Sequence, residues 1–469
     1  AVDAAVAISI ALGVVEPYAS GIGGGGNMLI FPVDGTDPVV YDYREMAPSQ
    51  LNKKYQIGVP GLIKGMETIA EDFGRFSFAK LLEPAIELAE NGFPIGKVLA
   101  TQLIMTKHKH LKSYEHFYPG QMPLQENETL IQKALAESLK KIAKYGSDYF
   151  YQGELARKFA AANVGITLED MEGYEIKIRK PLKSEYGSLD LWSAPAPVGG
   201  AYIIQTLRLA ELLDIDQLHV LSPDFIAIFG KMMQELTKRR MTYNGDPEFN
   251  VINESDIISD RYIEEIAQEI KQSTYDPTIM LKDSNHTTHF SVVDADGMAV
   301  STTNTLSHFF GSGVYVEGIF LNNQMQNFSD NPDSPNKYEV GKRCQSIIAP
   351  TILSKDHKPV LVVGASGAAR IPTIIATTIF KYIKQGYSLE EAISESRFFV
   401  SQNKVMLEEE MNEKDVHLLQ QHGYTPVHFP EPMFYGGVQA LAIKNGELEG
   451  AADPRRGGIF KKKMIDESR

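Results

Sequence analysis

The sequence predicts a layered α/β fold of the α+β type, in which antiparallel sheets pack against helices. One observation is a β-hairpin pattern, with strands at His289–Val293 and Met298–Thr305 on either side of the turn Asp294–Gly297. The other is a set of long helical patterns, of which Phe78–Asn91 is the clearest amphipathic case. Hairpins followed by long helices indicate helical layers over antiparallel sheets.

The first part of the chain alternates helices with short strands. An alanine-rich helix is expected at Val2–Val15, and the glycine-rich run Ser20–Gly26 follows it. Strand patterns come next at Asn27–Val33 and Val39–Arg44, and helical periodicity then dominates residues 60–139. The remaining elements are helices after the loop Pro195–Gly200, at Tyr262–Ile270 and from Ser366 to about Gln385, and strands at Ile319–Asn322, Gln345–Leu353 and Pro359–Val363.

Composition excludes several classes of protein. The 469 residues carry 46 Lys plus Arg, 60 Asp plus Glu, a net charge of −14 and one Cys. A negative chain with one thiol is neither a nucleic-acid binder nor a disulfide scaffold. No apolar run reaches the ~18 residues of a membrane span, and no signal peptide is visible. Residues 287–469 hold 18 basic and 21 acidic residues, so most of the negative charge lies in residues 1–286.

Two glycine-containing turns have both a structural and a functional interpretation. Gly21, Gly23 and Gly26 satisfy the G-x-G-x-x-G spacing, but here a helix precedes and a strand follows, the reverse of a dinucleotide-binding turn. Close backbone packing, or the lining of a substrate cleft, is the favoured interpretation. Ser366–Ala368 follows a buried strand and opens a helix, so it is either a tight turn or an oxyanion site.

The pair Thr287–Thr288 at the head of the hairpin is the candidate nucleophile. Thr favours β-strands, so a Thr pair at the start of a strand is also common without any catalytic role. A catalytic role would require a cut just before Thr287, after which the new α-amine could act as the base for its own hydroxyl. The histidines do not cluster at metal spacing, so no metal site is expected and most are expected at the surface.

Several motifs occur together and in one order along the chain. They are Ser20–Gly25, Tyr43–Pro48, Val59–Gly61, Thr287–Asp294, Phe310–Gly313, Leu321–Met325 and Asp453–Arg456. In this combination the sequence resembles the γ-glutamyltranspeptidase family over essentially its whole length. The motif at Thr287–Asp294 is the most specific of them.

The resemblance implies a fold and a division of the chain. The fold is the four-layer αββα sandwich of the N-terminal nucleophile hydrolases. The precursor is expected to cut itself into a large subunit of residues 1–286 and a small subunit of residues 287–469, which remain together as one intertwined heterodimer. Thr287 then becomes both the nucleophile and a new N-terminus, and Thr305 orients it.

The resemblance also assigns roles to other residues without a cofactor or a metal. Gly367 and Ala368 are expected to supply the oxyanion site. The expected substrate-binding residues are Arg44, Gln324, Asn327, Arg343 and Ser346. Arg44 would hold a substrate carboxylate through a charge-assisted contact.

Departures from the family pattern concern the recognition of the glutamyl group. Asn327 stands where common members have an Asp that holds a free α-ammonium, and a neutral amide removes that charge complement. Ser346 is followed by Ile347 instead of a second Ser, Ala368 replaces a glycine, and Ser307 replaces an Asn. The short stretch 327–342 leaves no room for the family's lid over the pocket.

An open pocket with a weakened ammonium site suits an internal residue of a polymer. The sequence is thus similar to the family members that process poly-γ-glutamate capsules, cutting the polymer or transferring it to water, peptidoglycan or another amine acceptor. This predicts an enzyme at the cell surface or secreted. The alternatives are an ordinary glutathione-type member of the family and, from another class, an inactive binding homologue. Because the polymer is anionic, attraction is expected to be local, from Arg44, Lys342–Arg343 and Arg455–Arg456.

Overall fold

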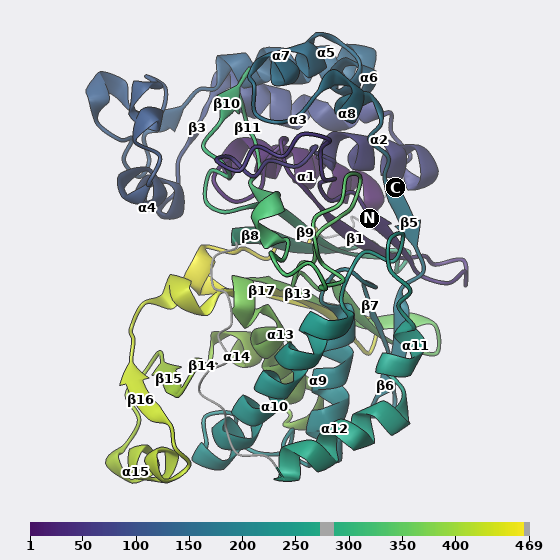
Figure 1. Cartoon of the computed structure of the whole chain (residues 1–469), viewed down its shortest axis with the longest axis vertical. Coiled ribbons are helices and arrows are strands. Elements are labelled where there is room, and N and C mark those ends of the chain that lie inside the picture. Colours follow the sequence, from purple (N-terminus) through teal and green to yellow (C-terminus); the bar gives the residue numbers. More distant parts are fainter. Residues whose placement is uncertain (273–285, 464–469) are drawn as a thin grey trace.

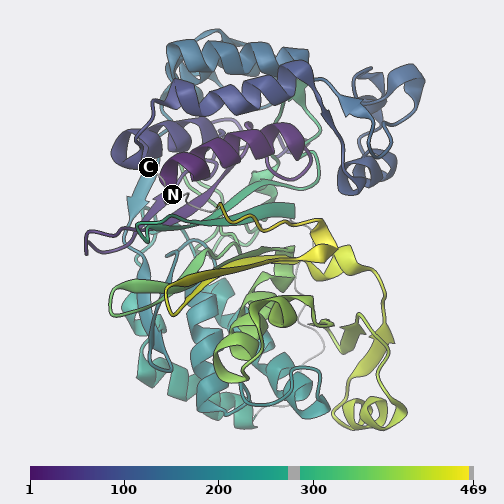
Figure 2. The ribbon, with the colours of Figure 1, turned by 180° about the vertical axis from the view of Figure 1, so that it is seen from behind.

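Two facing β-sheets form the centre of the molecule, and helices cover the outer face of each (Figures 1 and 2). The computed structural model describes residues 1–272 and 286–463. This arrangement is a four-layer αββα sandwich with predominantly antiparallel strand pairing, as the sequence predicts.

The first sheet has five strands in the order β5-β2-β1-β9-β8. In chain order they are β1 (Gly25–Phe31), β2 (Val39–Asp42), β5 (Lys177–Arg179), β8 (His286–Val293) and β9 (Ala299–Ser307). All neighbours are antiparallel, and β8 and β9 are the predicted hairpin. Its register pairs Thr287 with Thr305, and Thr305 pairs in turn with Gly25.

The second sheet has six strands in the order β18-β17-β13-β12-β7-β6. They are β6 (Leu182–Tyr186), β7 (Leu189–Ser193), β12 (Thr351–Lys355), β13 (Lys358–Ser366), β17 (Gly437–Lys444) and β18 (Glu447–Ala452). Smaller sheets join β3 (Phe93–Pro94) to β4 (Thr129–Leu130), β10 (Tyr315–Val316) to β11 (Ile319–Phe320), and β14 (Phe398–Ser401), β15 (Lys404–Leu407) and β16 (Thr425–His428) to one another.

The helical layer over the first sheet comes from the first third of the chain (Figure 1). It contains α1 (Val2–Val15), α2 (Leu62–Phe73), α3 (Phe78–Asn91), α5 (Lys133–Tyr145), α6 (Asp148–Tyr151), α7 (Glu154–Ala161) and α8 (Leu168–Glu172). Ser77 caps α3 by accepting a hydrogen bond from the backbone N–H of Lys80, which fixes where that helix begins. The segment around α4 (Lys97–Met105) projects from this layer.

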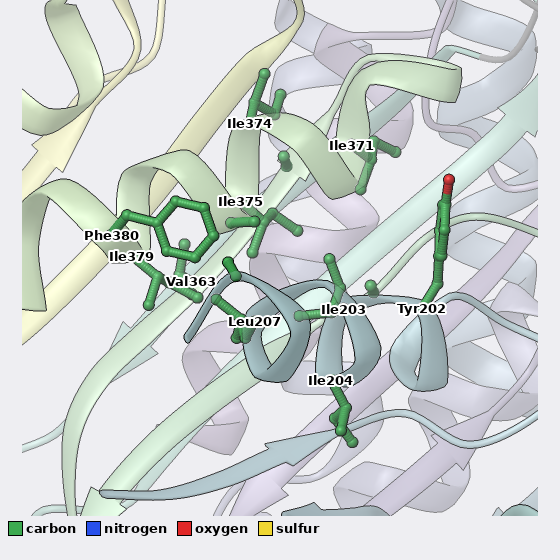
Figure 3. Packing of buried hydrophobic residues seen from close by; sticks show 14 of the residues in the cluster. Tyr202, Ile203, Ile204, Leu207, Val363, Ile371, Ile374, Ile375, Ile379 and Phe380 are labelled. Atoms are coloured by element: carbon green, nitrogen blue, oxygen red, sulfur yellow. The ribbon is translucent and has the colours of Figure 1, made fainter. Parts of the chain in front are cut away.

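The layer over the second sheet contains α9 (Gly200–Leu212), α10 (Pro223–Tyr243), α11 (Glu254–Ile257), α12 (Asp260–Gln272), α13 (Ile371–Ile379), α14 (Leu389–Ser394) and α15 (Glu413–Gln421). Figure 3 shows α9 and α13 packing over β13, with Ile203, Leu207, Val363, Ile375 and Phe380 in contact within one buried apolar cluster. Burial of such side chains stabilises each by roughly 1.5–3 kcal/mol relative to exposure. This cluster therefore fixes the position of β13, whose end leads into the turn at Gly367.

The structure confirms most of the predicted elements and shortens some, since the strand expected at Val39–Arg44 ends at Asp42 and the one expected at Ile319–Asn322 ends at Phe320. The helices at 2–15 and 78–91 have the predicted bounds. The strand expected at Gln345–Leu353 was wrong in its first half, since regular structure begins only at Thr351. Ser346 instead donates its N–H to the carbonyl of Pro197, and its own carbonyl accepts from Arg240 Nη2, so its backbone bonds to a loop and to a side chain of α10 instead of a strand.

Strands from both parts of the chain alternate within each sheet. The first sheet places β8 and β9 beside β1, and the second places β7 beside β12. Residues 1–286 and residues 287–469 therefore share both sheets and both cores. Within the described part of the chain, no helix is long and apolar enough to cross a membrane.

We expect Gly364→Ala to destabilise the contact between the two sheets. A Cβ at Gly364 would lie 2.1 Å from the ring of His289, and neither group has free space to move into. Overpacking of this kind costs roughly 1–3 kcal/mol, which thermal or denaturant unfolding measures. Gly96→Ala is the matched control, since no atom lies within 4 Å of the added Cβ. Equal stability of the two variants would contradict the described packing.

Candidate active site

Four residues form one row across the end of the first sheet. Thr287 of β8 pairs with Thr305 of β9, which pairs with Gly25 of β1. Arg44 is adjacent to Gly25, because a Cβ added to Gly25 would lie 2.7 Å from the Cα of Arg44. The structure thus brings three of the predicted site residues, Thr287, Thr305 and Arg44, to the same edge of the sandwich.

The glycine-rich run explains how the strands come this close. A Cβ on Gly24 would lie 2.2 Å from the carbonyl oxygen of Thr305, and one on Gly26 would lie 2.4 Å from that of Thr303. No side chain larger than hydrogen fits at those distances. Close backbone packing, the favoured interpretation of this run, is therefore what the structure contains.

Thr287 lies between the two sheets with only 3% of its surface exposed. Its Oγ1 has no hydrogen-bond partner among the described residues. A buried hydroxyl without a partner is uncommon and calls for an explanation. Across the hairpin, Thr305 Oγ1 accepts a hydrogen bond from the backbone N–H of Ser307 at 2.8 Å, which fixes its orientation.

His289 connects the Thr287 strand to the second sheet. Side chains alternate along a strand, so His289 points to the same side as Thr287. Its ring lies directly over Gly364 of β13 and hydrogen-bonds to Thr303 Oγ1 at 2.8 Å. Burial lowers the pKa of His289 to about 3, so the imidazole is neutral. The sequence interpretation placed most histidines at the surface, and for His289 this was wrong.

The end of β13 carries the predicted oxyanion turn. Ser366 is the last residue of β13, and Gly367 and Ala368 follow with φ values of 147° and 54°. The left-handed conformation of Ala368 costs roughly 1–2 kcal/mol for a residue with a Cβ. Such strain is typical of functional sites. It also accords with the glycine that the family pattern has at this position.

A single cavity joins the hairpin to this turn. Its volume is about 570 Å³, and Thr287, Thr288, Ser366 and Arg456 are among the residues that line it. His289 contacts Gly364 across the space between the two sheets. Thr287 lies two residues before His289 on β8, and Ser366 lies two residues after Gly364 on β13. The Thr287 side chain and the start of the oxyanion turn therefore face the same space.

Arg44 and Arg343 lie in a buried ionic network. Arg44 donates from Nε and Nη2 to the carboxylate of Asp42, both at 3.0 Å, and from Nη1 to the carbonyl of Cys344 at 2.7 Å. Arg343 lies 3.8 Å from Asp42 and donates to the carbonyl of Glu175. Burial alone would raise the pKa of Asp42, but Arg44 and Arg343 outweigh it and hold that pKa below its usual range. The structure thus shows internal partners for both arginines.

The other predicted binding residues lie around this network. Gln324 is 1% exposed, and neither atom of its side-chain amide has a hydrogen-bond partner among the described residues. Asn327 donates from Nδ2 to Ser307 Oγ at 3.5 Å, and its carbonyl accepts from Asn336. Ser346 is buried beside the loop of Pro197.

Cys344 is not a second nucleophile. It is 1% exposed, and its Sγ donates to the carbonyl of Gln324. Burial raises the pKa of its thiol to about 12, whereas nucleophilic cysteines have lowered values. Within residues 1–272 and 286–463, no three His, Cys, Asp or Glu side chains gather so as to hold a metal ion.

Sequence interpretation missed a carboxylate beside the hairpin, Glu16, and named its neighbour Arg456 only as a local positive charge. Glu16, at the end of α1, accepts a hydrogen bond from Thr288 Oγ1 at 2.5 Å. Burial raises the pKa of Glu16, while Thr288 and Arg456 act in the opposite direction. The guanidinium of Arg456 donates to the carbonyl of Met433 and lies near Tyr18. No local motif marks Glu16, because its partner lies 272 residues away.

Comparison with known proteins identifies relatives along the whole chain. The family model described as gamma-glutamyltranspeptidase matches residues 1–462. The capsule biosynthesis protein CapD proenzyme of Bacillus anthracis is 39% identical over 473 residues, covering 98% of this chain and 86% of that protein. A glutathione hydrolase proenzyme of Bacillus subtilis strain 168 is 33% identical over 509 residues, with the same two coverages.

Solved structures show the same fold. A cephalosporin acylase from Bacillus halodurans superimposes with a TM-score of 0.86 at 23% identity, covering 99% of this chain and 92% of that chain. The CapD transpeptidase of Bacillus anthracis superimposes with a TM-score of 0.51 at 37% identity, covering 56% of this chain and 90% of that chain. The first match supports the fold alone because its identity is low.

We expect His289 to make folding stability depend on pH. Its pKa of about 3 in the folded chain lies below the ordinary value of about 6.5. Between these values the unfolded chain binds a proton that the folded chain does not, so stability falls as the pH falls below about 6.5. From pH 7 to pH 5 the native chain should lose about 2 kcal/mol more than His289→Gln. Denaturant unfolding at both pH values measures this. His357→Gln, at an exposed residue, is the control, and equal losses in native chain and His289→Gln would contradict the prediction.

Proposed function

The chain belongs to the gamma-glutamyltranspeptidase family, and we propose that it is a self-processing enzyme that cleaves and transfers poly-γ-glutamate through an acyl-ester on Thr287. Membership in the family makes it a γ-glutamyl hydrolase or transpeptidase. The observation that carries the nucleophile assignment is the buried hydroxyl of Thr287, which has no hydrogen-bond partner among the described residues. Thr287 pairs with Thr305 across the hairpin and lines one cavity together with Ser366.

The proposed enzyme first cuts its own chain before Thr287. The two relatives compared above are both named proenzymes, which supports a precursor. The cut would yield residues 1–286 and 287–469, and strands shared between the two parts would hold them together. The new α-amine of Thr287, with an ordinary pKa of roughly 7.7–8, then serves as the base.

The proposed reaction proceeds in two steps. Thr287 Oγ1 attacks the γ-amide carbonyl of the substrate while its proton passes to the α-amine, and a tetrahedral oxyanion forms. Backbone N–H groups at Gly367 and Ala368 would stabilise this charge. Collapse releases the amine half of the substrate and leaves the γ-glutamyl ester. Water or an amine acceptor then attacks the ester and regenerates Thr287.

The polymer substrate is proposed from the neutral side chain of Asn327. Its amide donates to Ser307 Oγ and carries no charge with which to hold a free α-ammonium. An internal residue of poly-γ-glutamate has no such ammonium, because its α-amine is already acylated. The amide of Gln324, which has no hydrogen-bond partner within residues 1–272 and 286–463, would bind the polymer's amide or carboxylate groups. The 39% identity to a capsule biosynthesis protein supports a role in processing a capsule.

A capsule polymer lies outside the cell, so the proposed site of action is the cell surface or the medium. Poly-γ-glutamate is a polyanion and the chain carries a net charge of −14, so overall charge opposes binding. Arg44 and Arg343 supply local positive charge, although each also forms an ion pair that offsets part of the negative charge of Asp42. The second candidate is a glutathione-type enzyme, favoured by the relatives that are glutathione hydrolases.

Thr287→Ala should leave the chain uncut and inactive, because it removes the attacking oxygen for both processing and turnover. Electrophoresis and N-terminal sequencing would show one chain of 52.1 kDa, in contrast to native fragments of which one begins at Thr287. Thr287→Ser retains the hydroxyl and should retain processing. Fragments starting at Thr287, or normal turnover, in the Ala variant would refute the nucleophile assignment.

The native enzyme should prefer poly-γ-glutamate to a small γ-glutamyl anilide when kcat/KM is measured for both. Asn327→Asp should shift the ratio of the two values toward the anilide by roughly 5–150-fold, since it restores a carboxylate worth ~1–3 kcal/mol to a free ammonium. Asn331→Asp, at an exposed residue nearby in sequence, is the matched control. A native preference for the anilide would favour the glutathione-type alternative.

A further inference from the structure

Several of the cations that the sequence predicts to attract the polymer are buried in ion pairs. Lys342 has a fully buried side chain, and its Nζ lies 2.9 Å from the carboxylate of Glu339. The side chain of Arg455 is 6% exposed and lies 2.7 Å from the carboxylate of Glu408. Arg44 is likewise buried against a carboxylate. A chain with a net charge of −14 therefore needs another positive surface if it is to attract a polyanion.

A strongly basic segment projects from the helical layer over the first sheet (Figures 1 and 2). Residues 97–116, which we call the basic arm, hold four lysines, three histidines and one carboxylate. The lysines are all exposed and are Lys97, Lys107, Lys109 and Lys112. Within residues 1–272 and 286–463 none of these lysines forms an ion pair. The one carboxylate, Glu115, accepts a hydrogen bond from the N–H of Gly120. The basic arm thus presents positive charge to solvent.

The local fold of the basic arm directs two of these lysines outward. Its 3-10 helix η1 (Lys109–Ser113) has three residues per turn, so Lys109 and Lys112 lie on the same side. Leu111 lies on another side, where it is fully buried and belongs to the same apolar cluster as Leu306 of β9. Burial of Leu111 therefore anchors the arm to the first sheet and leaves the two lysines in solvent.

Hydrogen bonds and charge also place the basic arm beside the loop that follows β9. His110 Nε2 donates to the carbonyl of Gly313 in this loop at 2.7 Å. His308, at the start of the loop, bonds through its backbone N–H and its ring Nδ1 to the side-chain amide of Asn323 at 3.0 and 2.9 Å. Burial, together with the nearby positive charge of Lys107, lowers the pKa of His308 to about 4. The basic arm and the start of this loop are therefore neighbours.

The residue before His308 belongs to the candidate active site. Ser307 donates its N–H to Thr305 Oγ1 at 2.8 Å, and its hydroxyl accepts from Asn327 Nδ2 at 3.5 Å. Two consecutive residues, Ser307 and His308, thus connect the site on one side to the basic arm on the other. A chain-like substrate that leaves the site in this direction would meet the lysines of the arm.

We propose that the basic arm is a second binding surface for poly-γ-glutamate, which holds glutamyl residues of the polymer outside the active site. The inference rests on the proposed function and adds the path that the polymer takes across the enzyme. Each internal residue of the polymer carries one carboxylate, so consecutive residues contact Lys107, Lys109 and Lys112. A small γ-glutamyl donor ends within the site and reaches none of these lysines. The basic arm therefore lowers KM for the polymer alone.

The experiment reverses the charge of the basic arm and compares a long substrate with a short one. The triple variant Lys107→Glu, Lys109→Glu, Lys112→Glu is assayed at low salt with poly-γ-glutamate and with a γ-glutamyl anilide. KM for the polymer should rise roughly tenfold or more, since each exposed ion pair contributes a factor of about 1.4–5 and the new carboxylates repel the polymer. Both kinetic constants for the anilide should stay at their native values.

Three lysines elsewhere in the chain provide the matched control. Lys355, Lys358 and Lys444 are exposed and lie at the end of the second sheet that is opposite to Ser366, because β13 runs from Lys358 to Ser366 and pairs antiparallel with β12 and β17. Changing all three to Glu alters the net charge by the same amount as the arm variant. This control should keep a nearly native KM for the polymer, and added salt should reduce the difference between the two variants.

A binding measurement tests the ligand without turnover. Labelled poly-γ-glutamate is titrated into the Thr287→Ala chain, alone or combined with the arm changes or the control changes. The arm changes should weaken polymer binding roughly tenfold or more, and the control changes should not. Equimolar vesicles of phosphatidylglycerol and phosphatidylcholine serve as a second probe. Vesicle binding that depends on the basic arm, with polymer binding that does not, would overturn the inference in favour of a membrane surface.

The remaining outcomes separate this inference from the proposed function. Polymer KM values that are equal in the arm variant and the control variant would overturn the second binding surface and leave the proposed function standing. A native enzyme that cleaves the anilide but neither binds nor cleaves the polymer would overturn both.

Discussion

The rest of the site depends on the register of the β8–β9 hairpin. Pairing Thr287 with Thr305 places the candidate nucleophile opposite the residue that is expected to orient it. The same pairing brings His289 over Gly364, and that contact sets where the first sheet meets the second. A slip of one residue would turn Thr287 toward α1 and bring Thr288 between the sheets. One set of backbone hydrogen bonds therefore determines both the fold and the geometry of the site.

The lack of a side chain at several glycines is a second constraint on which the site depends. The glycine run before β1 lets that strand approach Thr305, and Gly364 leaves room for the His289 ring. The buried pair of Arg44 and Asp42 then closes the other end of the row. An uncompensated charge there would be costly, so each partner requires the other. A cavity of about 570 Å³ lies along β8 beside the Thr287 end of this row.

The sequence predicted the elements whose signals are local. The hairpin follows from alternating residues around Asp294–Gly297, and the helix Phe78–Asn91 follows from its periodicity. Contacts between distant segments were not predictable in this way. Glu16 meets Thr288 across 272 residues, and the strand expected at Gln345 was replaced by hydrogen bonds to the loop of Pro197. The alternation that places His289 on the same side as Thr287 was a usable signal, and so was the two-residue spacing of Asp42 and Arg44 at the end of β2. The roles of Arg44, Gln324, Asn327 and Ser346 in binding stay predictions.

The most direct test of the account is to identify the residue that carries the acyl group. The enzyme would be mixed with a γ-glutamyl donor, quenched in acid and digested, and its peptides would be sequenced by mass spectrometry. The account predicts a γ-glutamyl ester on a peptide whose first residue is Thr287. A γ-glutamyl group on any other residue, or a labelled peptide in which Thr287 is still preceded by His286, would contradict it.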